Sequence, residues 1–273
     1  MKPDQQQIVS CSSRVPVIRR ARNFYIYDMK GNRYLDLYRD NGNCLFGHRP
    51  AGSIKALKII LEKGLGARLP SVYNLRLKNE LAAFFPEYNS FSVFPSLAEA
   101  LDFFSIRFGK KINRNDIYNP FYSKNNPGSG ISWWRPYSEK NIHSEIILPV
   151  FSAGFGDASV LVCQKKKGQD SVPIFSSPVI LQSLRSALSL YKQTLVPEWI
   201  HELQNKRTDL FYQDGIYLCF QKNRAHYRAV FDHFLGQGVL LSPFNSSPSI
   251  LPFDVSENEI KKLTQLLEKG GTI

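Results

Sequence analysis

Apolar and polar residues alternate along residues 17–37, and this alternation predicts a β-hairpin. Lys30, Gly31 and Asn32 lie between its two halves, and glycine beside asparagine is typical of a tight turn. Further along, apolar residues recur at helical spacing. This pattern predicts helices at 50–63, 74–85 and 97–108, with a strand at 90–94 before the third helix.

The second half of the chain continues with shorter apolar runs. They predict strands at 116–121, 145–150 and 158–163, a loop at 125–137 that carries Trp133 and Trp134, a glycine-bearing turn at 152–157, and a helix at 178–195. The last part predicts strands at 215–221 and 239–242 and helices at 226–235 and 256–268. Because strands and helices alternate, we predict an α/β fold. Its expected parts are an arm and hairpin (1–49), a large α/β domain (50–198) and a small C-terminal α+β domain (199–273).

Composition narrows the class of protein. Of the 273 residues, 43% are hydrophobic and 21% are charged, which is typical of a folded globular chain. Lys and Arg number 35 and Asp and Glu 23, so the net charge of +12 permits weak attraction to polyanions, acidic lipids or an acidic protein. The basic residues are scattered except at Lys165, Lys166 and Lys167, so we do not expect a nucleic-acid partner.

Cysteine and histidine spacing argues against a metal or disulfide site. Four cysteines are widely spaced without a CxxC pair, which indicates a reducing compartment. His226 and His233 lie seven residues apart without a third ligand, so no metal is expected. No leader and no apolar run of bilayer length is visible. We therefore expect a cytoplasmic protein with no membrane partner.

Two motifs carry a resemblance to a known family. The first contains Tyr27, Asp28, Gly31, Asn32, Tyr34, Leu35, Asp36, Gly47 and His48. The second contains Gly238, Val239, Leu240, Leu241, Ser242 and Pro243, followed by Glu257, Glu259 and Ile260. In this order they resemble class III aminotransferases, which are pyridoxal-phosphate (PLP) enzymes of fold type I, and particularly the glutamate-1-semialdehyde aminomutase branch.

The resemblance implies a truncated fold type I large domain with a reduced, mostly parallel sheet of four or five strands, plus the small C-terminal domain. It also implies where a cofactor would bind. The family's phosphate-binding turn reads Ser-Gly-Thr-Glu-Ala, and the equivalent residues here are Ser96, Leu97, Ala98, Glu99 and Ala100. Leu97 replaces the glycine that lets the backbone approach a phosphate, and Ala98 removes a hydroxyl. Ser96, Leu97, Ala98, Glu99 and Ser176 are therefore the residues of a degenerate cofactor site, and an ordinary strand-to-helix turn is the simpler interpretation.

PLP catalysis needs a lysine that forms an imine with the cofactor and a carboxylate at the pyridine nitrogen. The family's Asp-Glu-Val sequence, which supplies the carboxylate, does not occur in this chain. One alignment register places Val150 at the lysine position, and a second makes Lys165 the nearest lysine. We prefer the register with Val150. The number of residues between Val150 and the segment Ile174, Phe175 and Ser176 matches the spacing between the family's lysine and its following Thr-Phe-Ser segment.

These replacements predict a catalytically inactive pseudoenzyme that binds no cofactor and has no catalytic residue. Family active sites form at the subunit interface, so we expect a homodimer or a complex with a full-length relative. Two alternatives remain open. One is a divergent PLP-dependent transaminase or aminomutase that uses Lys165, and the other is a module that binds a small anion near Ser96, Gly154 and Trp133.

Overall fold

The computed structural model describes residues 10–50, 52–122, 130–140, 142–150, 160–165, 176–204, 210–221 and 226–269. Its contacts divide the chain into two compact units. Unit 1 comprises Met1–Asn41, Tyr137–Glu139 and Leu195–Ile273, and unit 2 comprises Gly42–Pro136 and Lys140–Thr194. The N-terminal hairpin and the C-terminal segment, which are remote in sequence, therefore belong to one unit.

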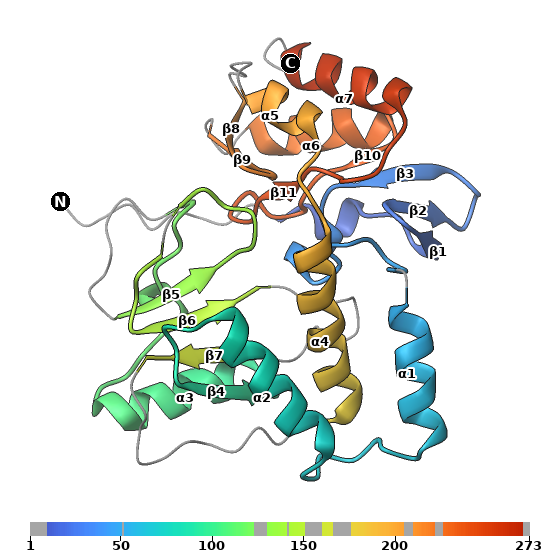
Figure 1. Cartoon of the computed structure of the whole chain (residues 1–273). Helices are drawn as coiled ribbons and strands as arrows, with labels where there is room; N and C mark the ends of the chain where they lie inside the picture. The colour runs from blue at the N-terminus through green and yellow to red at the C-terminus, as the bar shows by residue number, and fades with distance from the viewer. Residues whose placement is uncertain are drawn as a thin grey trace, which may run out of the picture. The chain divides into compact units, whose positions relative to one another are not determined.

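Unit 2 contains a four-stranded sheet (Figure 1). Its strands lie in the order β4 (Ser90–Phe94), β7 (Val160–Gln164), β6 (Ile146–Pro149) and β5 (Ile131–Trp134). β7 pairs antiparallel with both β4 and β6, and β5 pairs parallel with β6. Three strands thus run in one direction, as the predicted reduced sheet requires. Because the reversed strand lies between β4 and β6, only the β5–β6 pairing is parallel.

The described part of unit 2 also contains four α-helices. They are α1 (Ser53–Glu62), α2 (Val72–Phe84), α3 (Leu97–Phe108) and α4 (Pro178–Gln193). α4 packs against α1 and α2, and α3 buries Ala100 and Phe104 in a core with Ile131, Leu148 and Val162 from the sheet. α3 begins where the side chain of Ser96 caps it and ends at Gly109, whose φ of 62° is the left-handed conformation that favours glycine.

The described part of unit 1 contains two small sheets and three α-helices. The first sheet has the order β1 (Ile18–Arg22), β2 (Tyr25–Asp28), β3 (Arg33–Asp36) and β10 (Val239–Leu240), and the second has the order β11 (Ser249–Ile250), β9 (Tyr217–Phe220) and β8 (Phe211–Asp214). The helices are α5 (Glu198–Gln204), α6 (Tyr227–Gly236) and α7 (Glu257–Lys269). The parallel pairing of β3 with β10 connects the hairpin to the C-terminal segment.

The predicted hairpin turn is held by one carboxylate. Oδ1 of Asp28 accepts the backbone N–H groups of Lys30 at 2.9 Å and Asn32 at 2.8 Å, and Oδ2 accepts the side-chain amide of Asn32 at 2.9 Å. Gly31 takes a φ of 87° that disfavours other residues. These contacts explain why the Asp-x-x-Gly-Asn sequence folds as a turn here.

Some local predictions were wrong. Trp133 and Trp134 lie on β5 and not in a loop, since aromatic residues suit a pleated strand despite the nearby glycine, proline and serine residues. Residues 116–121 form no strand; Tyr118 makes a single bridge to Ser132. β8 and α5 were not predicted. The predicted turn at 152–157 and Ile174 lie outside the described residues.

Candidate functional site

Three strands of unit 2 end at the same edge of the sheet, because β4, β5 and β6 run in one direction. β4 leads to Ser96, β5 to Arg135 and β6 to Val150. The backbone N–H of Val150 donates to the carbonyl oxygen of Trp134 at 2.9 Å. Ligands of open α/β sheets bind at the carboxyl ends of the strands. The structure therefore brings Ser96 and Val150, both singled out in the sequence, to the edge where such a site forms.

The turn into α3 is a helix cap. The hydroxyl of Ser96 accepts the backbone N–H of Glu99 at 3.2 Å, and the Ser96 backbone is extended. Leu97 is half-buried, whereas Ala98 and Glu99 are exposed. The carboxylate of Glu99 lies in the first turn, where it interacts favourably with the helix dipole. Glutamate also occupies this position in the family's turn, so the departures from a phosphate-binding sequence are Leu97 and Ala98.

Val150 has closely packed neighbours. A Cβ atom added to Gly42 would lie 3.4 Å from Cγ1 of Val150 and 3.5 Å from a terminal nitrogen of Arg135. Gly42 has a φ of 105°, so its backbone favours glycine, although an added Cβ would make only ordinary van der Waals contacts with these neighbours. Arg135 is buried, and its guanidinium lies 5.7 Å from the ring centre of Phe121. Valine has no amine, so this position cannot form an imine.

Lys165 lies at the other end of the sheet. Its neighbour Gln164 pairs with Ser90, the first residue of β4, whereas Ser96 follows the last residue of that strand. Five strand residues span about 17 Å, so the structure does not bring Lys165 to Ser96. The amine of Lys165 lies 3.6 Å from Oε2 of Glu87, in a surface ion pair.

The other residues of unit 2 that the sequence singled out take part in helix capping and core packing. Ser176 is buried, next to Ser177, whose hydroxyl caps α4. Trp134 makes edge-to-face contacts with Phe84, Phe85 and Tyr191 from α2 and α4, at ring-centre distances of 5.0 to 6.2 Å. Gly154 lies outside the described residues. Within the described ranges, no group of three or more His, Cys, Asp or Glu side chains is arranged to hold a metal.

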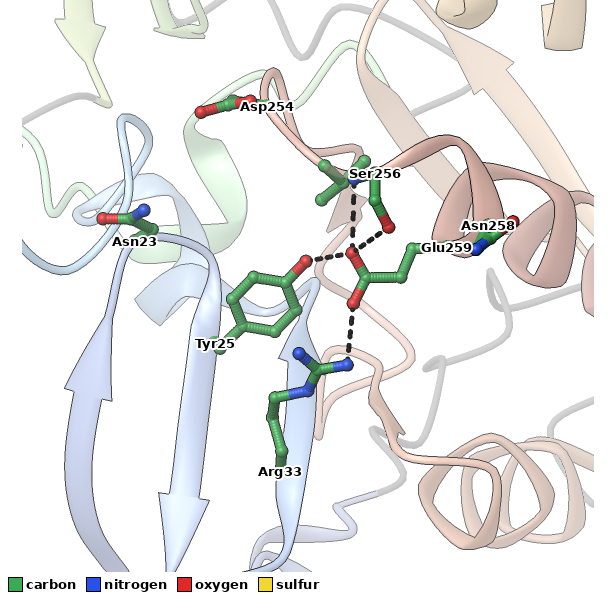
Figure 2. Close-up of a pocket in the computed structure, with 8 residues that line it drawn as sticks. Asn23, Tyr25, Arg33, Asp254, Ser256, Asn258 and Glu259 are labelled. Carbon is green, nitrogen blue, oxygen red and sulfur yellow. Dashed lines mark hydrogen bonds and ion pairs between the residues drawn. The ribbon is translucent and has the colours of Figure 1, made fainter.

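A cavity of about 640 Å³ lies in unit 1, between the hairpin and the start of α7 (Figure 2). It is lined by Asn23, Tyr25, Arg33, Asp254, Val255, Ser256, Asn258 and Glu259. A second cavity of about 100 Å³ shares Tyr25, Arg33 and Glu259 with it. These three side chains therefore form the wall between the two cavities.

The carboxylate of Glu259 has four interactions in this wall (Figure 2). One oxygen accepts the Tyr25 hydroxyl, together with the Ser256 hydroxyl at 2.9 Å and the Ser256 N–H at 3.3 Å, and the other lies 3.1 Å from the Arg33 guanidinium. Burial raises the pKa of Glu259, but the hydrogen bonds and the Arg33 charge lower it below the usual value overall. Burial, followed by the bond to Glu259, raises the pKa of Tyr25. A carboxylate held this way is a structural link and not a free base.

The sequence revealed only part of this cluster. Ser256 and Glu259 form a helix-capping box, and a serine followed three residues later by a glutamate is recognisable in the sequence. Tyr25 and Arg33 were not predicted to join them, because they lie more than 200 residues earlier and no local pattern reports such a contact.

Replacing Glu259 with glutamine keeps the shape of the side chain and removes its charge. We expect the free energy of unfolding to fall by about 1 kcal/mol at pH 7, since the Arg33 ion pair is partly exposed to solvent. Folding lowers the pKa of this carboxyl, so its contribution is complete above the unfolded value of 4.5 and is lost as the pH falls through the folded value. Urea unfolding at neutral pH and below about pH 4 checks this. A difference between wild type and E259Q that persists unchanged in acid would contradict it.

The fold of the chain is that of PLP-dependent aminotransferases. The solved structure of ornithine aminotransferase from Plasmodium yoelii superposes with a TM-score of 0.66, covering 93% of this chain and 92% of that one. The sequence identity is 14%, so this likeness concerns the fold. The predicted α/β fold class is thereby confirmed.

Sequence comparison finds relatives with higher identity, two of which are given by organism. A protein of unassigned function from Borreliella burgdorferi is 29% identical over 255 residues, which cover 92% of this chain and 90% of the relative. The glutamate-1-semialdehyde 2,1-aminomutase of Syntrophobacter fumaroxidans is 28% identical over 83 residues, 30% of this chain and only 19% of that enzyme. No protein-family model matches the chain. No helix among the described residues is long and apolar enough to cross a membrane.

Proposed function

We propose that this protein is a catalytically inactive member of the aminotransferase-like class, which retains the fold for a binding role in the cytoplasm. The observation that carries the proposal is Val150, which directly follows β6 at the carboxyl edge of the sheet, where the resemblance places the imine-forming lysine. The changes at Leu97 and Ala98 support the proposal. The loss of both the imine-forming lysine and the phosphate-binding turn is harder to compensate than the loss of either one.

The proposal includes the cofactor. At the turn into α3, Leu97 replaces the glycine that lets the backbone approach a phosphate, and Ala98 lacks the hydroxyl of the family's threonine. Lys165 is separated from that turn by the length of β4. We therefore propose that PLP is not a cofactor of this chain.

The test is incubation of the purified protein with equimolar PLP in the presence of excess free lysine, which competes for non-specific imines. We expect no new absorbance band of a protein-bound imine. We also expect no pyridoxyl adduct by mass spectrometry after borohydride reduction, for wild type and for Lys165→Ala alike. A stoichiometric adduct on a single lysine would refute the proposal. If that adduct disappears in Lys165→Ala, the divergent enzyme is the correct alternative.

We propose a homodimer, or a complex with a full-length relative, as the binding role. Val17 is 75% exposed and Met29 is 63% exposed, and the two are adjacent because the N–H of Met29 donates to the carbonyl of Val17 at 3.1 Å. Ile18 adds further exposed apolar area on β1, the edge strand of its sheet. Exposed apolar residues on an edge strand favour pairing with another chain. This hairpin surface is therefore the proposed contact.

A further inference from the structure

The connection between α1 and α2, which lies at the lower edge of Figure 1, carries exposed apolar residues. Apart from Leu65, every residue from 61 to 70 is exposed. Five large apolar residues contribute here with exposed fractions of 40 to 65%: Ile59, Leu61, Leu69, Val72 and Leu75. We call this set, with the basic residues of 53–78, the α1–α2 surface.

These apolar residues do not belong to the core-facing sides of their helices. Leu57 and Ile60 of α1, and Tyr73 and Leu77 of α2, are already buried and form those sides. α4 packs against both helices within unit 2. The exposed leucines and valine therefore lie outside the packed interior, and a cluster of this kind marks a contact surface.

The same surface is strongly basic. Residues 53–78 contain six basic residues and one acidic residue, Glu62. The six basic residues are all exposed: Lys55, Lys58, Lys63, Arg68, Arg76 and Lys78. In the described part of the chain, the four lysines and Arg68 form no ion pair with a carboxylate. A tenth of the chain thus carries a net charge of +5 out of +12.

We infer that the α1–α2 surface binds peripherally to the anionic phospholipid surface of a bilayer. A lipid interface accepts apolar side chains at headgroup depth while its phosphates attract lysine and arginine, so both features of the surface are used at once. Such binding needs no spanning segment. The expectation of no membrane partner, which was based on the lack of a bilayer-length apolar run, does not apply to this mode.

Other partners fit the surface less well. A twofold contact with a second copy would place two sets of unpaired positive charges face to face, which is unfavourable. Single-stranded nucleic acid binds where exposed aromatic rings stack on bases, and the aromatic residue of this surface, Tyr73, is buried. Charge complementarity therefore favours an acidic lipid surface.

The experiment is co-sedimentation of the full chain with vesicles of phosphatidylcholine, with and without about 30% phosphatidylglycerol. We expect binding only to the anionic vesicles, weakened at least fivefold when NaCl rises from about 50 to about 500 mM. The charge variant Lys63→Gln/Arg68→Gln should bind about tenfold or more weakly. The apolar variant Leu69→Ser/Leu75→Ser should weaken binding by about the same factor.

Matched variants elsewhere in unit 2 provide the controls. Lys110→Gln/Lys111→Gln removes the same charge from another exposed segment, and Ile106→Ser removes a side chain that is 84% exposed. Both should bind anionic vesicles like the wild type. Circular dichroism establishes that each variant is folded.

Three outcomes would overturn the inference. The first is the absence of binding to anionic vesicles at low salt. The second is an equal loss of binding in Lys110→Gln/Lys111→Gln, which would indicate an effect of net charge alone. The third is a dimer, measured by light scattering without lipid, that becomes a monomer in Leu69→Ser/Leu75→Ser, which would show that a second copy covers this surface. None of these outcomes depends on the PLP experiment, so the failure of this inference and that of the proposed function are distinguishable.

Discussion

Replacing Gly215 with alanine lowers the free energy of unfolding of unit 1 by about 3 kcal/mol or more. A Cβ atom at this position would lie 1.9 Å from the carbonyl oxygen of Tyr137, which is backbone and cannot rotate away. Gly215 also has a φ of 54°, an unfavourable value for alanine. The neighbouring contacts resist a shift, because Oδ1 of Asp214 accepts the Ser138 hydroxyl and the Glu139 N–H, each at 2.8 Å. The steric overlap must therefore be relieved by breaking native contacts.

A substitution at a second glycine measures the backbone strain without the steric overlap. Gly64 has a φ of 68° and no atom within 4 Å of an added Cβ. Gly64→Ala should therefore lower the free energy of unfolding only by the conformational strain, about 1 kcal/mol. Urea unfolding followed by far-ultraviolet circular dichroism measures both variants. Equal losses for the two glycines would show that residues 137–139 do not pack against the β8–β9 turn as described.

Replacing Arg39 with alanine should lower the free energy of unfolding by about 3 kcal/mol. Arg39 is completely buried, and one terminal nitrogen donates to the carbonyl of Ile250 at 2.9 Å while Nε donates to the carbonyl of Asp36 at 3.3 Å. Its guanidinium also lies 4.5 Å from the ring centre of Phe24. Alanine leaves a cavity and deprives two buried carbonyls of a donor.

Arg39→Gly distinguishes lost contacts from backbone strain. Arg39, Asp40 and Asn41 have φ values of 45°, 49° and 55°, and three consecutive non-glycine residues in the left-handed region are costly. Glycine removes the same contacts as alanine but relieves the strain at position 39. We expect Arg39→Gly to be more stable than Arg39→Ala by about 1 kcal/mol, the reverse of their order in a helix. Thermal or urea unfolding of the pair decides this, and greater stability of the alanine variant would refute it.

Much of the local structure could be predicted because it depends on neighbouring residues. The helix 97–108 and the strand 90–94 have the predicted bounds, since a serine cap, a terminal glycine and apolar periodicity define them locally. β5 was missed because Gly130 and the preceding proline and serine residues resemble a loop, while its strand character depends on pairing with β6.

The candidate site shows the same division between local and distant causes. The predicted replacement of the family's lysine by Val150 and of its glycine by Leu97 is based on the amino-acid order alone, because it concerns residue type. Three features became visible only in the folded chain. Lys165 and Ser96 lie at opposite ends of β4, and Tyr25 and Arg33 contact Glu259. Arg39 is buried. Each of these depends on segments that are distant in sequence, and side-chain periodicity reports only contacts within a few residues of the same element.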